Sequence, residues 1–149
     1  MLIRFSAHSR RRAALLLVAV GIGTGLPLVT ASSSSAAVVC GSSATARVSI
    51  VYRACVESVT STAFTAHYQY GNNHGAAVAI STRYGWKVGS KTEWFGPSTI
   101  TLRKAAGFVE RESNTWVCEK GQRGTAVVQV KQNNGDWGPT ASFLTLTCG

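Results

Sequence analysis

Apolar and polar residues alternate along most of the chain after residue 37, which is the pattern of half-buried β-strands. Between Arg47 and Val56 every second residue is apolar: Val48, Ile50, Tyr52, Ala54 and Val56. Further extended segments are predicted at 64–70, 78–86, 93–95, 100–102, 108–119, 126–131 and 142–148. No segment after residue 37 has the 3.6-residue period of an amphipathic helix.

Glycine- and asparagine-rich segments separate these strands, as turns that tolerate positive φ require. They lie at 71–75, 88–90, 104–107, 120–124 and 133–136, and Gly96-Pro97 is expected to end the strand at 93–95. Seven to eight short antiparallel strands predict an all-β fold, a single immunoglobulin-like β-sandwich. Trp116 and Cys118 share one side of a strand, so the indole is expected to pack against a disulfide in the core.

The first 37 residues have the pattern of an export signal. A basic start with Arg10–Arg12 precedes a short apolar run at 13–20 and a small-residue stretch that ends at Ala37. We expect cleavage after Ala37, with Ala36 and Ala31 as alternative sites, and ordinary secretory export ahead of the twin-arginine route. Residues 38–149 then form a secreted, extracellular domain, monomeric and without a membrane span.

Charge sets weak limits on partners. The chain has 15 lysines and arginines against 6 acidic residues, and loss of the signal's four arginines leaves 11 against 6, a net charge of +5. The basic residues are scattered rather than gathered in a run, so we predict no nucleic-acid partner. The positive surplus is compatible with weak attraction to an anionic cell-wall polymer.

The four cysteines all follow the signal, and they lack the short paired spacing of a zinc site or a C-x-x-C redox motif. In an exported chain they are expected to form two disulfides. Sequential pairing, Cys40–Cys55 and Cys118–Cys148, is favoured because it closes the shorter loops. The alternative joins Cys55 to Cys118 and Cys40 to Cys148. Each bridge is expected to stabilise the fold by about 3 kcal/mol.

Candidate catalytic groups are sparse. His67 and His74 have no acidic neighbour in sequence that would orient either as a general base. Glu110 and Glu112 are expected on one strand face, where they resemble a glycosidase pair but are better explained as a solvated edge. The sequence has no phosphate-binding glycine loop and no nucleophile elbow. We predict that the protein is not an enzyme and that it has no catalytic residue, metal site or cofactor.

Tryptophans give the one indication of binding. Trp86 and Trp116 fall on apolar faces and are expected in the core. Trp94 adjoins Phe95, so only one of the two can face inward, and Trp137 lies beside a loop. An exposed indole is a flat platform for a sugar ring or a protein partner. Trp94 and Trp137 are therefore the predicted ligand-binding residues, against the simpler interpretation that each caps the sandwich edge.

Four short segments carry a family resemblance: YRACV at 52–56, GNNHG at 71–75, WVC at 116–118 and LTLTCG at 144–149. They resemble segments of the small, secreted, disulfide-containing β-sandwich proteins of actinobacteria, most of which are uncharacterised. This resemblance implies the fold and no known activity. A fainter resemblance, in size, terminal cysteines and surface tryptophans, is to cellulose-binding sandwich modules, although the chain has no Trp-x-Trp strand.

These features together predict a secreted, non-enzymatic binding module that acts at or beyond the cell surface. Its expected ligand is a cell-wall or extracellular polysaccharide, or a secreted protein. The alternative is a secreted inhibitor of an extracellular enzyme. Such an inhibitor would present a rigid loop, such as 121–124 or 133–138, held by the Cys118–Cys148 bridge, because anchored loops lose less entropy on binding.

Overall fold

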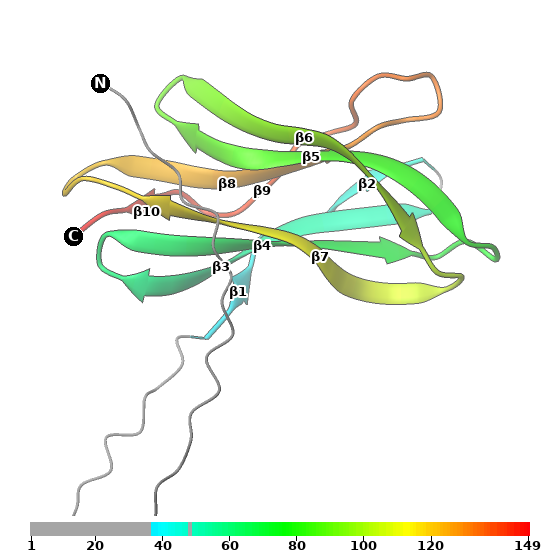
Figure 1. The fold of residues 1–149 in the computed structure, drawn as a ribbon, viewed down its shortest axis with the longest axis horizontal. Coiled ribbons are helices and arrows are strands. Elements are labelled where there is room, and N and C mark those ends of the chain that lie inside the picture. Colours follow the sequence, from blue (N-terminus) through cyan, green and yellow to red (C-terminus); the bar gives the residue numbers. More distant parts are fainter. Residues whose placement is uncertain (1–36, 48) are drawn as a thin grey trace, which may run out of the picture. The chain divides into compact units, whose positions relative to one another are not determined.

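Two antiparallel sheets make up the computed structural model, which describes residues 37–47 and 49–149 (Figure 1). Sheet 1 has the order β1-β3-β4-β7, with β2 also paired to β3. Sheet 2 has the order β10-β8-β5-β6, with β9 also paired to β8. The predicted export signal at 1–37, apart from Ala37, and the predicted strand residue Val48 lie outside the described residues.

The strands of sheet 1 are β1 (Val39–Cys40), β2 (Ala44–Ala46), β3 (Ile50–Thr60), β4 (Ala63–Asn72) and β7 (Ala106–Val117). Those of sheet 2 are β5 (Val78–Val88), β6 (Lys91–Leu102), β8 (Arg123–Val130), β9 (Ala141–Ser142) and β10 (Leu146–Thr147). The two sheets face each other as layers (Figure 1), and the predicted all-β sandwich is confirmed. The described residues contain no helix of the length and apolarity needed to cross a membrane.

Strand β6 differs from the prediction, because it continues through Gly96-Pro97 instead of ending there. Its register with β5 shifts between Thr82 and Tyr84, where β6 contributes an additional residue. Gly96 adopts a φ of +99°, and a Cβ there would lie 2.9 Å from the carbonyl oxygen of Thr82. A β-bulge therefore absorbs the glycine and proline, and the two short predicted strands become one long edge strand.

Large aromatic side chains fill the space between the sheets. Trp86 of β5 and Trp116 of β7 are 3% and 5% exposed, and their ring centroids lie 5.1 Å apart. Phe64 also stacks on Trp116, with ring centroids 6.1 Å apart. Gly124 of β8 leaves room for this cluster, since a Cβ at that position would lie 2.5 Å from the indole of Trp116. The core positions predicted for Trp86 and Trp116 are confirmed.

A polar network crosses the same interior. The side-chain oxygen of Asn114 accepts hydrogen bonds from Tyr68 Oη of sheet 1 at 2.8 Å and from Trp86 Nε1 of sheet 2 at 3.1 Å. The carboxylate of Glu112 likewise accepts hydrogen bonds from Tyr70 Oη of sheet 1 and from Thr82 Oγ1 of sheet 2. Because buried polar groups need partners, these bonds favour one alignment of the two sheets.

Both disulfides follow the favoured sequential pairing, and the alternative pairing is wrong. Cys40–Cys55 joins register partners on β1 and β3 within sheet 1. Cys118–Cys148 joins the residue after β7 of sheet 1 to the residue after β10 of sheet 2. The second bridge therefore ties the C-terminal segment, which pairs with β8, to the opposite sheet.

Alkaline pH is expected to unfold the protein as its buried phenols ionise. Burial raises the pKa of Tyr52 to about 12 and raises those of Tyr68, Tyr70 and Tyr84 above 10, with the charge of Glu112 adding to the last three. An unfolded tyrosine ionises near pH 10, so the stabilisation is complete below pH 10 and is lost above it. Each phenol lowers the free energy of unfolding by up to about 1.4 kcal/mol per pH unit above that point.

We expect tyrosinate ultraviolet absorbance to appear together with the loss of far-ultraviolet circular dichroism during alkaline titration. Tyr84 is the control group, since it is the least buried of the four and should ionise before the others. Absorbance from all four phenols near pH 10, with the circular dichroism intact, would contradict this burial.

Candidate functional site

The candidate site is built from the outward-facing residues of sheet 2. Tyr84 and Trp86 point inward, so strand alternation turns Arg83, Gly85 and Lys87 to the outer face. Gly85 pairs with Trp94 of β6 on one side and with Val127 of β8 on the other. Its missing side chain is required, because a Cβ would lie 1.8 Å from the carbonyl oxygen of Glu93. The backbone of β6 therefore approaches β5 closely at this point, and Trp94 and Val127, on either side of Gly85, both line the groove described next.

An open groove of about 810 Å³ lies on this outer face of sheet 2. Thr92 and Trp94 of β6 form one side, and the C-terminal segment around β9 and β10 forms the other. Five hydroxyl side chains line it, together with apolar and basic groups: Thr92, Thr125, Thr140, Ser142 and Thr145; Trp94, Val127, Phe143 and Leu144; Lys87 and Arg123; and Gly89. Leu144 is 77% exposed. The surface combines an indole, aliphatic groups, hydroxyls and cations, which is the mixture of a binding surface.

Arg83 organises the aromatic residues beside this groove. Its guanidinium carbon lies 4.5 Å from the ring centroid of Trp94 and 4.3 Å from that of Trp137. Its Nε donates a hydrogen bond to Oε1 of Gln129, the register partner on β8, at 2.8 Å. Burial lowers the pKa of Arg83 from its usual value. These contacts fix the positions of both indoles.

The structure brings the two predicted ligand-binding tryptophans together and gives them different surroundings. Trp94 faces outward and lines the groove, while its neighbour Phe95 packs inward on Tyr84 with ring centroids 5.8 Å apart. Trp137 is half-buried against Arg83, with Lys131 Nζ 5.8 Å from its ring, and it is not among the residues that line the groove. Trp94 is therefore the better placed of the two to contact a ligand.

Sequence reasoning missed the polar residues of this site. Lys87 and Arg123 were counted only as scattered charges, although both line the groove, and Arg83 and Gln129 were given no role. The two-residue alternation along β5 places Arg83 and Lys87 on one face, and this can be seen in the sequence. The sequence could not show that residues within 140–145 line the groove, because their position depends on the pairing of the C-terminal segment with β8.

Glu110 and Glu112 do not share a strand face, contrary to the sequence prediction. Tyr68 pairs with Glu112 and Gln69 with Glu110, so Arg111 is an additional residue in β7, and the register shifts there. Glu110 consequently points outward from sheet 1, whereas Glu112 points into the core toward Tyr70. A β-bulge reverses the two-residue period, and it separates the two carboxylates that had resembled a glycosidase pair.

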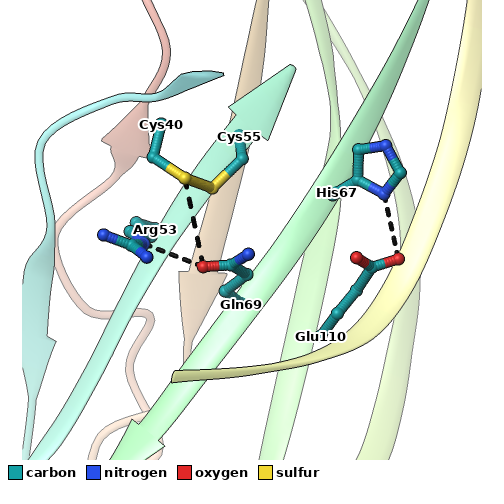
Figure 2. The surroundings of a disulfide bond; sticks show 6 residues. All are labelled: Cys40, Arg53, Cys55, His67, Gln69 and Glu110. Atoms are coloured by element: carbon teal, nitrogen blue, oxygen red, sulfur yellow. Dashed lines mark hydrogen bonds and ion pairs between the residues drawn. A yellow bond between two sulfur atoms is a disulfide. The ribbon is translucent and has the colours of Figure 1, made fainter. Parts of the chain in front are cut away.

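His67 lies on the outer face of sheet 1, near the Cys40–Cys55 bridge (Figure 2). Its Nδ1 lies 2.9 Å from Oε1 of Glu110, and its Nε2 lies 3.5 Å from Oε2 of Glu57. Both ring nitrogens therefore face carboxylates of neighbouring strands, and Nε2 is buried. The cluster orients the imidazole but leaves neither nitrogen directed at open space for a substrate.

His74 lies in the loop after β4, beside a smaller hollow of about 220 Å³ that includes Ser49 and Asn133. Its Nδ1 accepts a hydrogen bond from the backbone N–H of Ala76 at 3.2 Å. In this arrangement Nδ1 is the acceptor, and the neutral ring carries its proton on Nε2. Within the two described ranges, no group of three or more His, Cys, Asp and Glu residues is placed to hold a metal ion.

We expect Arg83→Met to loosen Trp94 and to lower the free energy of unfolding by about 1 kcal/mol, because two cation–π contacts are lost. Urea unfolding and acrylamide quenching of tryptophan fluorescence measure the two effects. Arg53→Met is the matched control, since Arg53 also donates to a cross-strand glutamine, Gln69, and stacks 4.0 Å from the centroid of an aromatic ring, Phe108. An equal rise in quenching in both variants would contradict this role of Arg83.

Comparison with known proteins adds no assignment for this site. No protein-family model, curated protein or solved structure matches the chain. The resemblances to actinobacterial secreted sandwich proteins and to cellulose-binding modules therefore stay predictions.

Proposed function

We propose that this protein is a secreted, non-enzymatic binding module that holds a polysaccharide on the outer face of sheet 2. The observation that carries the proposal is the position of Trp94, whose indole lines an open groove with hydroxyl side chains on both sides. Sugar rings pack their C–H faces on indoles, and their hydroxyls exchange hydrogen bonds with side-chain hydroxyls and bridging water.

The form of the groove supports a chain-like ligand. It lies open along the sheet between β6 and the C-terminal segment, rather than enclosed within the protein. The C-terminal side is held in place by the backbone hydrogen bond from Phe143 N to Ala126 O, at 3.0 Å, and by the Cys118–Cys148 bridge. A site held in place before binding loses less entropy when it takes up a ligand.

Two disulfides are consistent with an extracellular protein, and the signal-like residues 1–37 support export. The proposed module acts as a monomer at or beyond the cell surface, without a nucleic-acid partner, cofactor or metal. The immunoglobulin-like comparison stays a prediction, and the proposal needs only the two-sheet sandwich.

Retention on insoluble polysaccharides and cell walls tests the proposal. We expect Trp94→Ala to abolish retention that persists at high salt, because the stacking surface in the groove is removed. Trp137→Ala should have a smaller effect, about threefold, through the loss of one contact to Arg83.

Phe108→Ala is the matched control, because Phe108 is a 38% exposed aromatic residue on sheet 1 that also stacks on an arginine. It should leave retention unchanged. Equal losses for Trp94→Ala and Phe108→Ala would argue against a specific platform on sheet 2. Retention that disappears at high salt for every variant would mean that net charge alone causes the binding.

The alternative proposal, a secreted inhibitor, has support in the turn between β8 and β9. Asn134 Nδ2 donates to Asp136 Oδ2 at 2.7 Å, and the backbone N–H of Asp136 donates to Asn134 Oδ1 at 3.1 Å, so the turn is internally braced. Tyr52 Oη, from sheet 1, also donates to the carbonyl of Pro139. An inhibitor would show no glycan retention and would slow a secreted enzyme at stoichiometric ratio.

A further inference from the structure

The charge of the groove indicates which polysaccharides it would accept. Two cations, Lys87 and Arg123, lie among its twelve lining residues, and no carboxylate does. Lys87 pairs with Thr125 of β8, and Arg123 begins the same strand, so the two cations lie near one end of the groove. Both side chains are exposed, and neither has an ion pair within residues 37–47 and 49–149.

None of the chain's six carboxylates lines the groove, and Glu119 and Asp136 lie in the turns before and after β8. Glu57 and Glu110 lie on the outer face of sheet 1 with His67, and Glu112 lies in the interior. Glu93 is next to Trp94 in β6, but its register partner is the inward-facing Trp86, so alternation directs it away from the groove. The groove on the outer face of sheet 2 thus has two cations and no carboxylate among its lining residues, a combination that attracts anionic ligands.

Lys87 and Arg123 lie near one end of a surface that is otherwise suited to sugars. Trp94 lies on one side, and the hydroxyls of Thr125 and Thr145, which are 3.1 Å apart, join β8 to the opposite side. A neutral glycan would leave both cations without a counter-charge, whereas a polyanion without sugar rings would make no use of the indole. The groove therefore favours a ligand that supplies both negative charge and sugar rings.

From these contacts we infer that the groove binds an acidic polysaccharide, with anionic substituents at Lys87 and Arg123 and a sugar ring against Trp94. This inference rests on the proposed function, since it names the ligand class of the same groove. The ligand chemistry is a sugar chain that carries carboxylate or sulfate groups. The cations supply charge-assisted hydrogen bonds, and the indole supplies the preference for sugar over charge alone.

Binding of soluble polymers to the folded secreted chain tests the inference. The probes are polygalacturonate with its neutral methyl ester, dextran sulfate with neutral dextran, and poly-glutamate as an acidic polymer without sugar. We expect at least one acidic glycan to bind about tenfold more tightly than its neutral partner and than poly-glutamate at physiological salt.

Two double variants remove equal charge at opposite ends of the β5–β6 pair. Lys87→Gln/Arg123→Gln changes the groove, and Arg103→Gln/Lys104→Gln changes the exposed turn after β6. We expect the groove variant to weaken binding of the acidic glycan about tenfold and the turn variant less than twofold. Trp94→Ala should weaken acidic-glycan binding and leave any poly-glutamate binding unchanged. Near-ultraviolet circular dichroism verifies that each variant is folded.

Other binding results would contradict the inference, the proposed function, or both. Equal binding of neutral and acidic partners would overturn the inference and leave the proposed polysaccharide module standing. Equal weakening by both double variants, or poly-glutamate binding as tight as that of the glycans, would also overturn it in favour of net charge alone. Failure of every glycan, acidic and neutral, would overturn the proposed function as well.

Discussion

The meeting of Trp86 and Trp116 between the two sheets is the contact on which the rest of the structure depends. Each indole comes from a different sheet, and the absence of a side chain at Gly124 leaves the space that Trp116 occupies. Asn114 then accepts hydrogen bonds from Trp86 and from Tyr68, which links the aromatic packing to a fixed alignment of the layers. An interior of large rings and paired polar groups tolerates few other arrangements.

This inward packing determines the outer faces, because successive residues of a strand point to opposite sides. Once Tyr84 and Trp86 are inside, Arg83 and Lys87 are outside. Trp94 is also on the outer face, because it pairs with the outward-facing Gly85. The same arrangement occurs on both sheets: Arg83 on sheet 2 and Arg53 on sheet 1 each donate a hydrogen bond to a cross-strand glutamine and stack on an aromatic ring. On sheet 2 that arginine is held between two indoles.

The two outer faces consequently have different chemistry. Sheet 1 carries an imidazole, that of His67, whose two ring nitrogens face the carboxylates of Glu110 and Glu57. Sheet 2 carries a groove with two cations that lack a partner within the described part of the chain. Charge that is satisfied internally contributes little to recognition, whereas unpaired charge beside a flat indole is available to a ligand. The proposed binding surface follows from this difference.

The sequence alone determined the all-β class, the inward positions of Trp86 and Trp116, and the favoured disulfide pairing. These features depend on local alternation and on chain separation, both of which can be read from one strand at a time. It also selected Trp94, but it could not distinguish the setting of Trp94 from that of Trp137. That difference depends on the contacts of Arg83 in β5 with Trp94 in β6 and with Trp137 in the loop after β8, which are distant in sequence.

Only the tertiary structure decided where the alternation is interrupted and which distant segments meet. The bulge at Arg111 sends Glu110 and Glu112 to opposite faces, and the bulge at Gly96 keeps β6 continuous. Bulges arise from the register between paired strands, which a single strand's pattern does not contain. The pairing of β5 with both β6 and β8 brings Lys87 and Arg123 to one surface with Trp94. The C-terminal segment, which pairs with β8 through β9 and β10, then adds the other side of the groove, and no local motif shows either contact.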